Sequence, residues 1–202
     1  MRTLGVRWNK LRRALINLQT GPGAAIIPPN VTRVHMDFAV TCKGGHMGPK
    51  KFWREILPRL KYHNPSIPMI VNRHRQNEIP PKMTIYVRNP DVPEPSEPQS
   101  LQQPPSSHAG LSKAQPPLPT EKTIELDMKD KHSSYILEYF VAETRAQVLK
   151  PTPEQVQEIQ SLQDLAKQGE YDRGVLDKLR AEKKREKDML ARARQAGGLS
   201  ED

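Results

Sequence analysis

The clearest pattern in the chain is a strict alternation of apolar and polar residues from 31 to 41. Val34, Met36 and Phe38 fall on one face of this stretch, and Arg33 falls on the opposite face. A period of two residues predicts a β-strand with one face against an apolar core. The same alternation returns in three shorter stretches, at 67–71, 83–88 and 123–128. The chain is therefore predicted to contain four strands.

A helix is predicted between the first two strands, over about residues 49–62. Phe52, Ile56 and Leu60 recur every four residues, which places them on one helical face. Pro58 lies inside this segment. We expect it to kink or tighten the last turn, because proline removes a backbone donor and clashes with the preceding turn.

Helices are predicted in three further places. One begins near Ser133 and carries apolar positions as far as Val148. Residues 1–22 form a basic amphipathic helix, and residues 150–202 form a helical extension with few apolar anchors. The apolar positions of the N-terminal helix are Trp8, Leu11, Leu15 and Leu18.

Residues 90–119 interrupt this order. They contain 9 prolines in 30 positions, no Phe, Trp or Tyr, and Val92 as their β-branched residue. Such a segment buries too little apolar surface to offset the entropy lost on ordering. We therefore expect a disordered or extended insertion.

The order of the predicted elements is helix, strand, helix, three strands and helix. It predicts an α/β fold of the thioredoxin-like class, with a four-stranded mixed sheet and helices on its faces. Four parts follow from this reading. They are the N-terminal basic amphipathic helix at 1–22, the thioredoxin-like domain at 23–89 and 120–149, the disordered Pro-rich insertion at 90–119, and the helical C-terminal extension at 150–202.

Composition is consistent with one compact domain and polar additions. The 202 residues are 35% hydrophobic, and the mean hydropathy is -0.75. Arg, Lys or Pro interrupts every apolar run before the roughly 18 residues that a bilayer crossing requires, so we expect no membrane insertion.

Charge is distributed unequally along the chain. Residues 1–88 contain 16 Lys and Arg against 3 Asp and Glu, a net charge of +13, whereas residues 89–202 contain 16 against 20, a net charge of -4. So much unpaired positive charge repels itself, and its usual partner is a polyanion. Nucleic acid is the leading candidate, and an anionic membrane is the less common one.

The opening segment is also poor in acids, since the first acidic residue is Asp37. A basic amphipathic helix of this kind resembles a mitochondrial import signal. It is equally consistent with a surface helix of the mature protein, and both interpretations can hold together.

Candidate catalytic chemistry is weak. Cys42 has no second cysteine with which to form a disulfide, so the two-thiol exchange of catalytic thioredoxin-like proteins is excluded within the molecule. Cys42 and His46 lack nearby residues that would complete a zinc site. No phosphate-binding glycine loop or nucleophile elbow is present. We expect no enzyme activity, cofactor, metal or small-molecule substrate.

Basic residues cluster on and around the predicted helix at 49–62. Lys50, Lys51 and Arg54 occupy neighbouring positions of one face, where they can reach phosphates together. The complete set of predicted RNA-binding residues is Arg7, Lys10, Arg12, Arg13, Lys50, Lys51, Arg54, Arg59, Lys61, Arg73 and Arg75.

Three neighbouring aromatic residues could add base stacking to these ionic contacts. They are Trp53, Tyr62 and His63. The alternative interpretation is a solvated basic face that only confers solubility, with Trp53 packed under the N-terminal helix.

The segment GPKKFWREILPRLKYHNPSIPM, at 48–69, resembles the signature of a family of thioredoxin-like mitochondrial proteins. This family includes ribosomal proteins of both mitoribosomal subunits and an accessory subunit of respiratory complex I. The resemblance covers roughly residues 1–88 and 121–149. The shared residues are Gly48, Lys50, Lys51, Phe52, Leu57, Pro58, Asn64 and Pro65. The chain departs from the family pattern in the insertion at 90–119 and in the tail beyond 150.

The resemblance implies a structural, non-catalytic protein of the mitochondrial ribosome. It implies a location in the mitochondrial matrix, with mitochondrial rRNA and neighbouring ribosomal proteins as partners. The strings LPRLKYHNP and GPGA most resemble the fungal large-subunit branch of the family. A protein of the small subunit and an accessory subunit of complex I are the alternatives.

Overall fold

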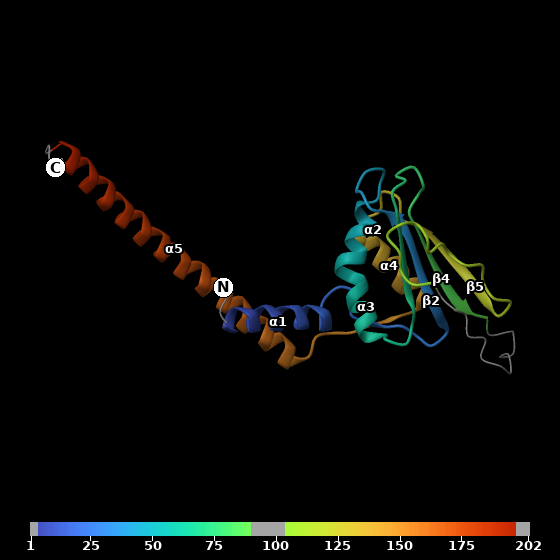
Figure 1. The fold of residues 1–202 in the computed structure, drawn as a ribbon. Helices are drawn as coiled ribbons and strands as arrows, with labels where there is room; N and C mark the ends of the chain where they lie inside the picture. Colours follow the sequence, from blue (N-terminus) through green and yellow to red (C-terminus); the bar gives the residue numbers. More distant parts are fainter. Residues whose placement is uncertain (1–3, 90–103, 197–202) are drawn as a thin grey trace. The chain divides into compact units, whose positions relative to one another are not determined.

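The computed structural model describes residues 4–89 and 104–196 (Figure 1). The first three residues of the predicted N-terminal helix, residues 90–103 of the predicted insertion and residues 197–202 of the predicted extension lie outside the described residues. The chain divides into two compact units, Met1–Thr152 and Pro153–Asp202. The sheet and its core belong to the first unit.

A four-stranded mixed sheet forms the centre of the first unit. Strand β2 (Val31–Ala39) pairs in parallel with β3 (Met69–His74) and antiparallel with β4 (Lys82–Arg88). Strand β5 (Glu121–Asp127) pairs antiparallel with β4, which gives the order β3-β2-β4-β5. The four predicted strands and the mixed α/β architecture are confirmed. Membership of the thioredoxin-like fold class stays a prediction.

A second, two-stranded sheet joins a segment that follows the first helix to a segment near the end of this unit. Strand β1 (Ala25–Ile26) pairs antiparallel with β6 (Gln147–Val148). Helix α4 (Ser133–Thr144) ends before β6, because Arg145 has a left-handed backbone with φ of 54°. The prediction that Val148 belongs to the closing helix is therefore wrong.

The helix between β2 and β3 is continuous but changes its pitch. Its segments are α2 (Met47–Lys51), the π-helical turn η1 (Phe52–Ile56) and α3 (Leu57–His63). The N–H of Leu57 donates to the carbonyl of Phe52, five residues earlier. Pro58 follows directly and has no N–H to donate. The predicted helix is confirmed, but the turn ahead of Pro58 is widened rather than tightened, since a π turn makes room for the proline ring.

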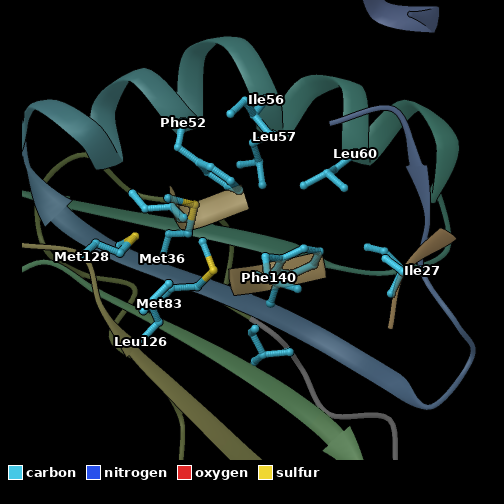
Figure 2. Close-up of a cluster of buried hydrophobic side chains, with 14 of the residues drawn as sticks. Ile27, Met36, Phe52, Ile56, Leu57, Leu60, Met83, Leu126, Met128 and Phe140 are labelled. Carbon is cyan, nitrogen blue, oxygen red and sulfur yellow. The ribbon is translucent and has the colours of Figure 1, made fainter. Parts of the chain in front are cut away.

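The apolar core lies between this helix, helix α4 and one face of the sheet. Figure 2 shows Phe52 and Leu60 of the helix directed toward the sheet, with Met36 and Met83 beneath them and Phe140 of α4 beside them. All five side chains are at most 1% exposed. Each large apolar side chain buried in this way contributes about 1.5–3 kcal/mol.

The opposite face of the sheet is covered by residues 104–119. His35 Nε2 lies 2.7 Å from the carbonyl oxygen of Ser112, and Arg33 donates to the carbonyl of Pro116 at 3.2 Å. Apart from a bridge at Ser107, the segment forms no helix or strand, as its prolines predict, but it is extended and held against the sheet. Of the two predicted alternatives, disordered or extended, residues 104–119 have the extended one. Polar contacts with the strands hold the segment there, in place of an apolar core.

The same segment closes the outer edge of β3. The N–H of Ser107 donates to the carbonyl of Val71 at 3.0 Å, and the Ser107 carbonyl accepts from the N–H of Arg73 at 2.8 Å. Gly110 adds a bond to the carbonyl of Arg73 at 2.9 Å. These bonds satisfy backbone groups that an edge strand would otherwise expose to other chains.

Two helices flank the sheet domain in sequence. Helix α1 (Leu4–Gln19) confirms the predicted N-terminal helix. Helix α5 (Pro153–Ala196) is a single element of 44 residues in the second unit and confirms the helical extension. None of the helices within residues 4–89 and 104–196 combines the length and apolar character that spanning a membrane requires.

Candidate nucleic-acid interface

Lys50 differs from its two basic neighbours on the helix. Its ammonium group donates to the carbonyl of Val40 at 2.9 Å, and it lies 3.4 Å from the sulfur of Cys42. The side chain therefore joins the start of the helix to the residue that follows β2. Lys50 has an internal role that the sequence pattern did not indicate.

Lys51 and Arg54 are fully available at the surface. Both side chains are exposed, and neither forms a hydrogen bond or ion pair with the part of the chain that the structure describes. Arg75 is exposed in the same way, immediately after β3. These three cations meet the electrostatic requirement for phosphate contact without breaking any internal bond.

Arg59 and Lys61 use their donors on backbone carbonyls. Arg59 donates from Nε to Asn17 at 2.6 Å and from Nη1 to Pro22 at 3.0 Å. Lys61 donates to Pro65 at 3.0 Å and to Ile67 at 2.9 Å. Arg59 thus fixes the C-terminal end of α1 on α3, and Lys61 fixes the loop that leads into β3.

Tyr62 and His63 also hold helix α1. The hydroxyl of Tyr62 accepts from the side-chain amide of Gln19 at 3.2 Å, and His63 Nε2 lies 3.0 Å from the Gln19 carbonyl oxygen. The two rings contact each other edge to face, with centroids 5.1 Å apart. Their packing against the end of α1 explains their proximity to the basic residues without a stacked base.

Arg73 and Trp53 form a cation–π pair. The guanidinium carbon of Arg73 lies 4.4 Å from the centre of the Trp53 ring, and Phe38 contacts the same ring at a centroid distance of 6.1 Å. Both Trp53 and Arg73 are half-buried. Trp53 therefore packs between the sheet and a cation, and the alternative that placed it under the N-terminal helix is not what the structure has.

The predicted cations of α1 lie along the helix. Arg7, Lys10 and Arg13 are exposed, and Arg12 is half-buried. The first turn of the helix contains no acidic residue. Its apolar residues are open, since Trp8 is 60% exposed and three leucines of the helix are at least 49% exposed: Leu4, Leu11 and Leu15.

Arg33 is a cation whose role the sequence pattern did not reveal. It is 2% exposed and forms an ion pair with Glu121 at 3.0 Å. Its guanidinium carbon lies 3.9 Å from the centre of the Tyr86 ring. Burial raises the pKa of Tyr86, and its hydroxyl donates to the carbonyl of Gln115. No local signal in the sequence could have found this pair, because 88 positions separate its members.

The fold gives Cys42 and His46 different surroundings. Cys42 is exposed, whereas His46 is completely buried. Nδ1 of His46 accepts from the N–H of Ala39 at 3.1 Å, and Nε2 lies 3.3 Å from the carbonyl oxygen of Asn77. Burial lowers the pKa of His46, which favours the neutral ring that these bonds need. Residues 4–89 and 104–196 contain no cluster of three His, Cys, Asp or Glu side chains suited to a metal ion.

The signature residues Gly48 and Asn64 are explained by packing. A β-carbon at Gly48 would lie 1.7 Å from the carbonyl oxygen of Lys131. The side chain of Asn64 accepts from the N–H of Ile27 at 2.8 Å and donates to the carbonyls of Ala25 and Leu60, each at 2.8 Å. At these two positions the signature therefore reflects the contacts of the helix with its neighbours.

Comparison with known proteins gives a consistent result. Residues 49–133 match the family model described as "Mitochondrial ribosomal protein L51 / S25 / CI-B8 domain". The chain is 45% identical to the large ribosomal subunit protein mL61 of Neurospora crassa over 181 residues, which is 90% of this chain and 89% of that protein. It is 31% identical to the protein of the same name from Schizosaccharomyces pombe, over 40% of this chain and 59% of that protein. It is 29% identical to that of Saccharomyces cerevisiae, over 36% of this chain and 56% of that protein.

Proposed function

Because the chain belongs to the mitochondrial ribosomal protein L51/S25/CI-B8 family, we propose that it is a structural constituent of the large subunit of the mitochondrial ribosome. The observation that carries this proposal is the 45% identity to a large-subunit protein over 90% of the chain. The likeness spans the sheet domain and most of the flanking sequence. The protein is not an enzyme, in line with its family.

The large subunit is favoured over the two alternatives for the same reason. The three relatives named above are all large-subunit proteins. The family description also covers small-subunit and complex I proteins, so a shared domain alone would leave the choice open. The net charge of +13 in residues 1–88 favours a ribonucleoprotein over a protein complex without RNA.

Contact with rRNA occurs through the exposed cations of the first unit. Lys51, Arg54 and Arg75 have no internal partner among the described residues, so their charge is available to phosphates. Arg7 and Lys10 add exposed charge on α1. The helix that carries Lys51 and Arg54 is held in position by bonds to backbone carbonyls from Lys50, Arg59 and Lys61.

Neighbouring ribosomal proteins bind the extensions. In α5, every side chain from 171 to 195 is exposed, which includes Val175, Leu176, Leu179, Met189 and Leu190. A long helix with open apolar positions gains most of its stability from a partner. The protein is mitochondrial, and assembly into ribosomes places it in the matrix.

Sedimentation of a mitochondrial extract tests the proposal. The tagged full-length chain is followed through a sucrose gradient after the ribosomal subunits have been separated at low magnesium. We expect it in the large-subunit fractions, and we expect ribonuclease treatment to move it to lighter fractions. Recovery with the small subunit, or with a membrane-bound electron-transport complex that resists ribonuclease, would contradict the proposal.

A further inference from the structure

A groove beside the Trp53–Arg73 pair has no role in the function described so far. Its volume is about 380 Å³, and it lies between the helix η1–α3, strand β3 and residues 106–108. The walls are formed by Trp53, Leu57, Pro58, Lys61, Met69, Val71, Arg73, Ser106, Ser107 and His108. None of these described lining residues is acidic. The groove thus combines an apolar wall with cations.

We propose that this groove binds an unpaired nucleotide of RNA, with its base stacked on the outer face of the Arg73 guanidinium. The inference rests on the proposed ribosomal function and adds a defined site to it. Stacking of bases on aromatic rings and on arginine planes is how proteins hold single-stranded RNA. A lysine or arginine that contacts only phosphates would need neither an aromatic ring beside it nor an apolar wall.

The geometry of Arg73 supports a stacked base. Its guanidinium lies 4.4 Å from the Trp53 ring centre, and Trp53 is supported in turn by Phe38. The guanidinium has no hydrogen bond or ion pair within residues 4–89 and 104–196, so its five N–H donors remain available. Arg73 is therefore held over the Trp53 ring while its N–H donors can meet a phosphate or a base carbonyl.

The backbone of Arg73 is fixed as well. Its N–H donates to Ser107 at 2.8 Å, and its carbonyl accepts from Gly110 at 2.9 Å. The side chain therefore projects from a strand that is bonded on both sides, since β2 pairs with β3 on the inner side. A site whose main stacking group is already positioned loses less entropy on binding.

Lys61 supplies a second cation in the wall of the groove. Two of the three donors of its ammonium group are used on the carbonyls of Pro65 and Ile67. The third donor remains for a phosphate oxygen. Lys61 and Arg73 together thus match the charge of a nucleotide, whereas the apolar wall formed by Leu57, Met69 and Val71 suits the face of a base.

The test compares two conservative variants of the full-length chain. Arg73→Lys keeps the charge but loses the planar group, and Arg173→Lys makes the same change at an exposed position of helix α5, outside the basic surface. The probes are a single-stranded polyadenylate RNA of about ten nucleotides and an RNA duplex of similar length. Binding is measured by fluorescence anisotropy.

We expect the chain to bind the single strand more tightly than the duplex. Arg73→Lys should weaken single-strand binding about tenfold and leave duplex binding unchanged, because one stacked base is lost. Arg173→Lys should change neither affinity. Equal single-strand affinities for Arg73→Lys and the unsubstituted chain, or no preference for the single strand in the unsubstituted chain, would overturn the proposed site.

Tryptophan fluorescence gives a second readout. The chain has two tryptophans, so a Trp8→Phe background leaves Trp53 as the reporter. We expect the single-stranded probe to change the Trp53 emission in that background and to lose this effect with Arg73→Lys. An unchanged emission at saturating RNA would contradict the site. Sedimentation of Arg73→Lys with the large subunit separates the two proposals, since the groove can fail while the ribosomal function stands.

Discussion

Arg33 and Glu121 form a buried ion pair across the face of the sheet that lies away from the helices. The nitrogen and oxygen are 3.0 Å apart, and the side chains are 2% and 5% exposed. Glu121 also accepts from the hydroxyl of Thr32 at 2.7 Å and from the N–H of Leu118 at 3.2 Å. The pair therefore joins β2 to the start of β5 and to the end of the segment 104–119.

Glu121→Ala should destabilise the first unit by about 3 kcal/mol, because it leaves the guanidinium of Arg33 buried without its counter-charge. The free energy of unfolding in urea measures the effect. Glu125→Ala is the matched control on the same strand. Its pair with Lys82 is 3.6 Å long and more than half exposed on both sides, so a change of about 0.5 kcal/mol or less is expected. Equal losses of unfolding free energy in the two variants would show that the buried pair of Arg33 with Glu121 contributes no more than an exposed one.

Gly48→Ala should prevent normal folding or destabilise the first unit by more than about 3 kcal/mol. The added carbon would lie 1.7 Å from the Lys131 carbonyl oxygen, and backbone on both sides leaves no flexible group to move. Gly5→Ala is the control, since nothing lies within 4 Å of its added carbon. Thermal unfolding of both variants measures the difference. A Gly48→Ala protein as stable as the Gly5→Ala protein would show that the contact is not required.

The stability of the first unit should fall as the pH is lowered from about 6.5, the value of an unfolded histidine. Burial lowers the pKa of His35, and its Nε2 lies 2.7 Å from the Ser112 carbonyl oxygen. The unfolded chain therefore takes up a proton at a higher pH than the folded chain does. Stability is present above the unfolded pKa and is lost as the pH falls toward the folded pKa. His46 acts in the same direction, because burial also lowers its pKa.

Urea unfolding between pH 5 and 7.5 measures this dependence. His35→Gln keeps a donor for Ser112 and should flatten part of the curve, with the remainder due to His46. His108→Gln changes an exposed histidine and should leave the curve unchanged. A curve of the same slope in His35→Gln would show that His35 does not titrate with folding.

Lys51→Gln combined with Arg54→Gln should weaken binding to a transcribed fragment of large-subunit mitochondrial rRNA. The slope of log affinity against log salt should fall by about 1 for each phosphate contact that is lost. Both side chains are exposed, so the unfolding midpoint should stay the same. Lys113→Gln with Lys129→Gln removes the same charge from exposed positions outside the basic helix. If that control lowers the slope equally, the effect is one of net charge rather than of this surface.

Lys50 has a separate effect on stability through its bond to Val40, so the double variant at Lys51 and Arg54 leaves it unchanged. Lys50→Gln alone should lower the unfolding midpoint without changing the salt slope. The sequence places Lys50 beside Lys51 and Arg54, and only the contacts separate the internal cation from the exposed ones.

The sequence by itself determined the order of the elements and much of the sheet. The alternation through Val34, Met36 and Phe38 was sufficient for β2, because the side-chain period of a strand is a local property. The signature from Gly48 to Pro65 was sufficient for the family. The uneven charge of residues 1–88 pointed to a polyanionic partner, since net charge needs no knowledge of the fold.

The tertiary structure decided which polar residues are internal. Arg33 faces solvent in a simple alternating pattern, yet it is buried because residues 104–119 return across that face of the sheet. Trp53 meets Arg73 only because β2 and β3 pair in parallel beside the helix. Such contacts join residues that are far apart along the chain, and local periodicity contains no information about them. The division between buried and available charge therefore depends on the fold.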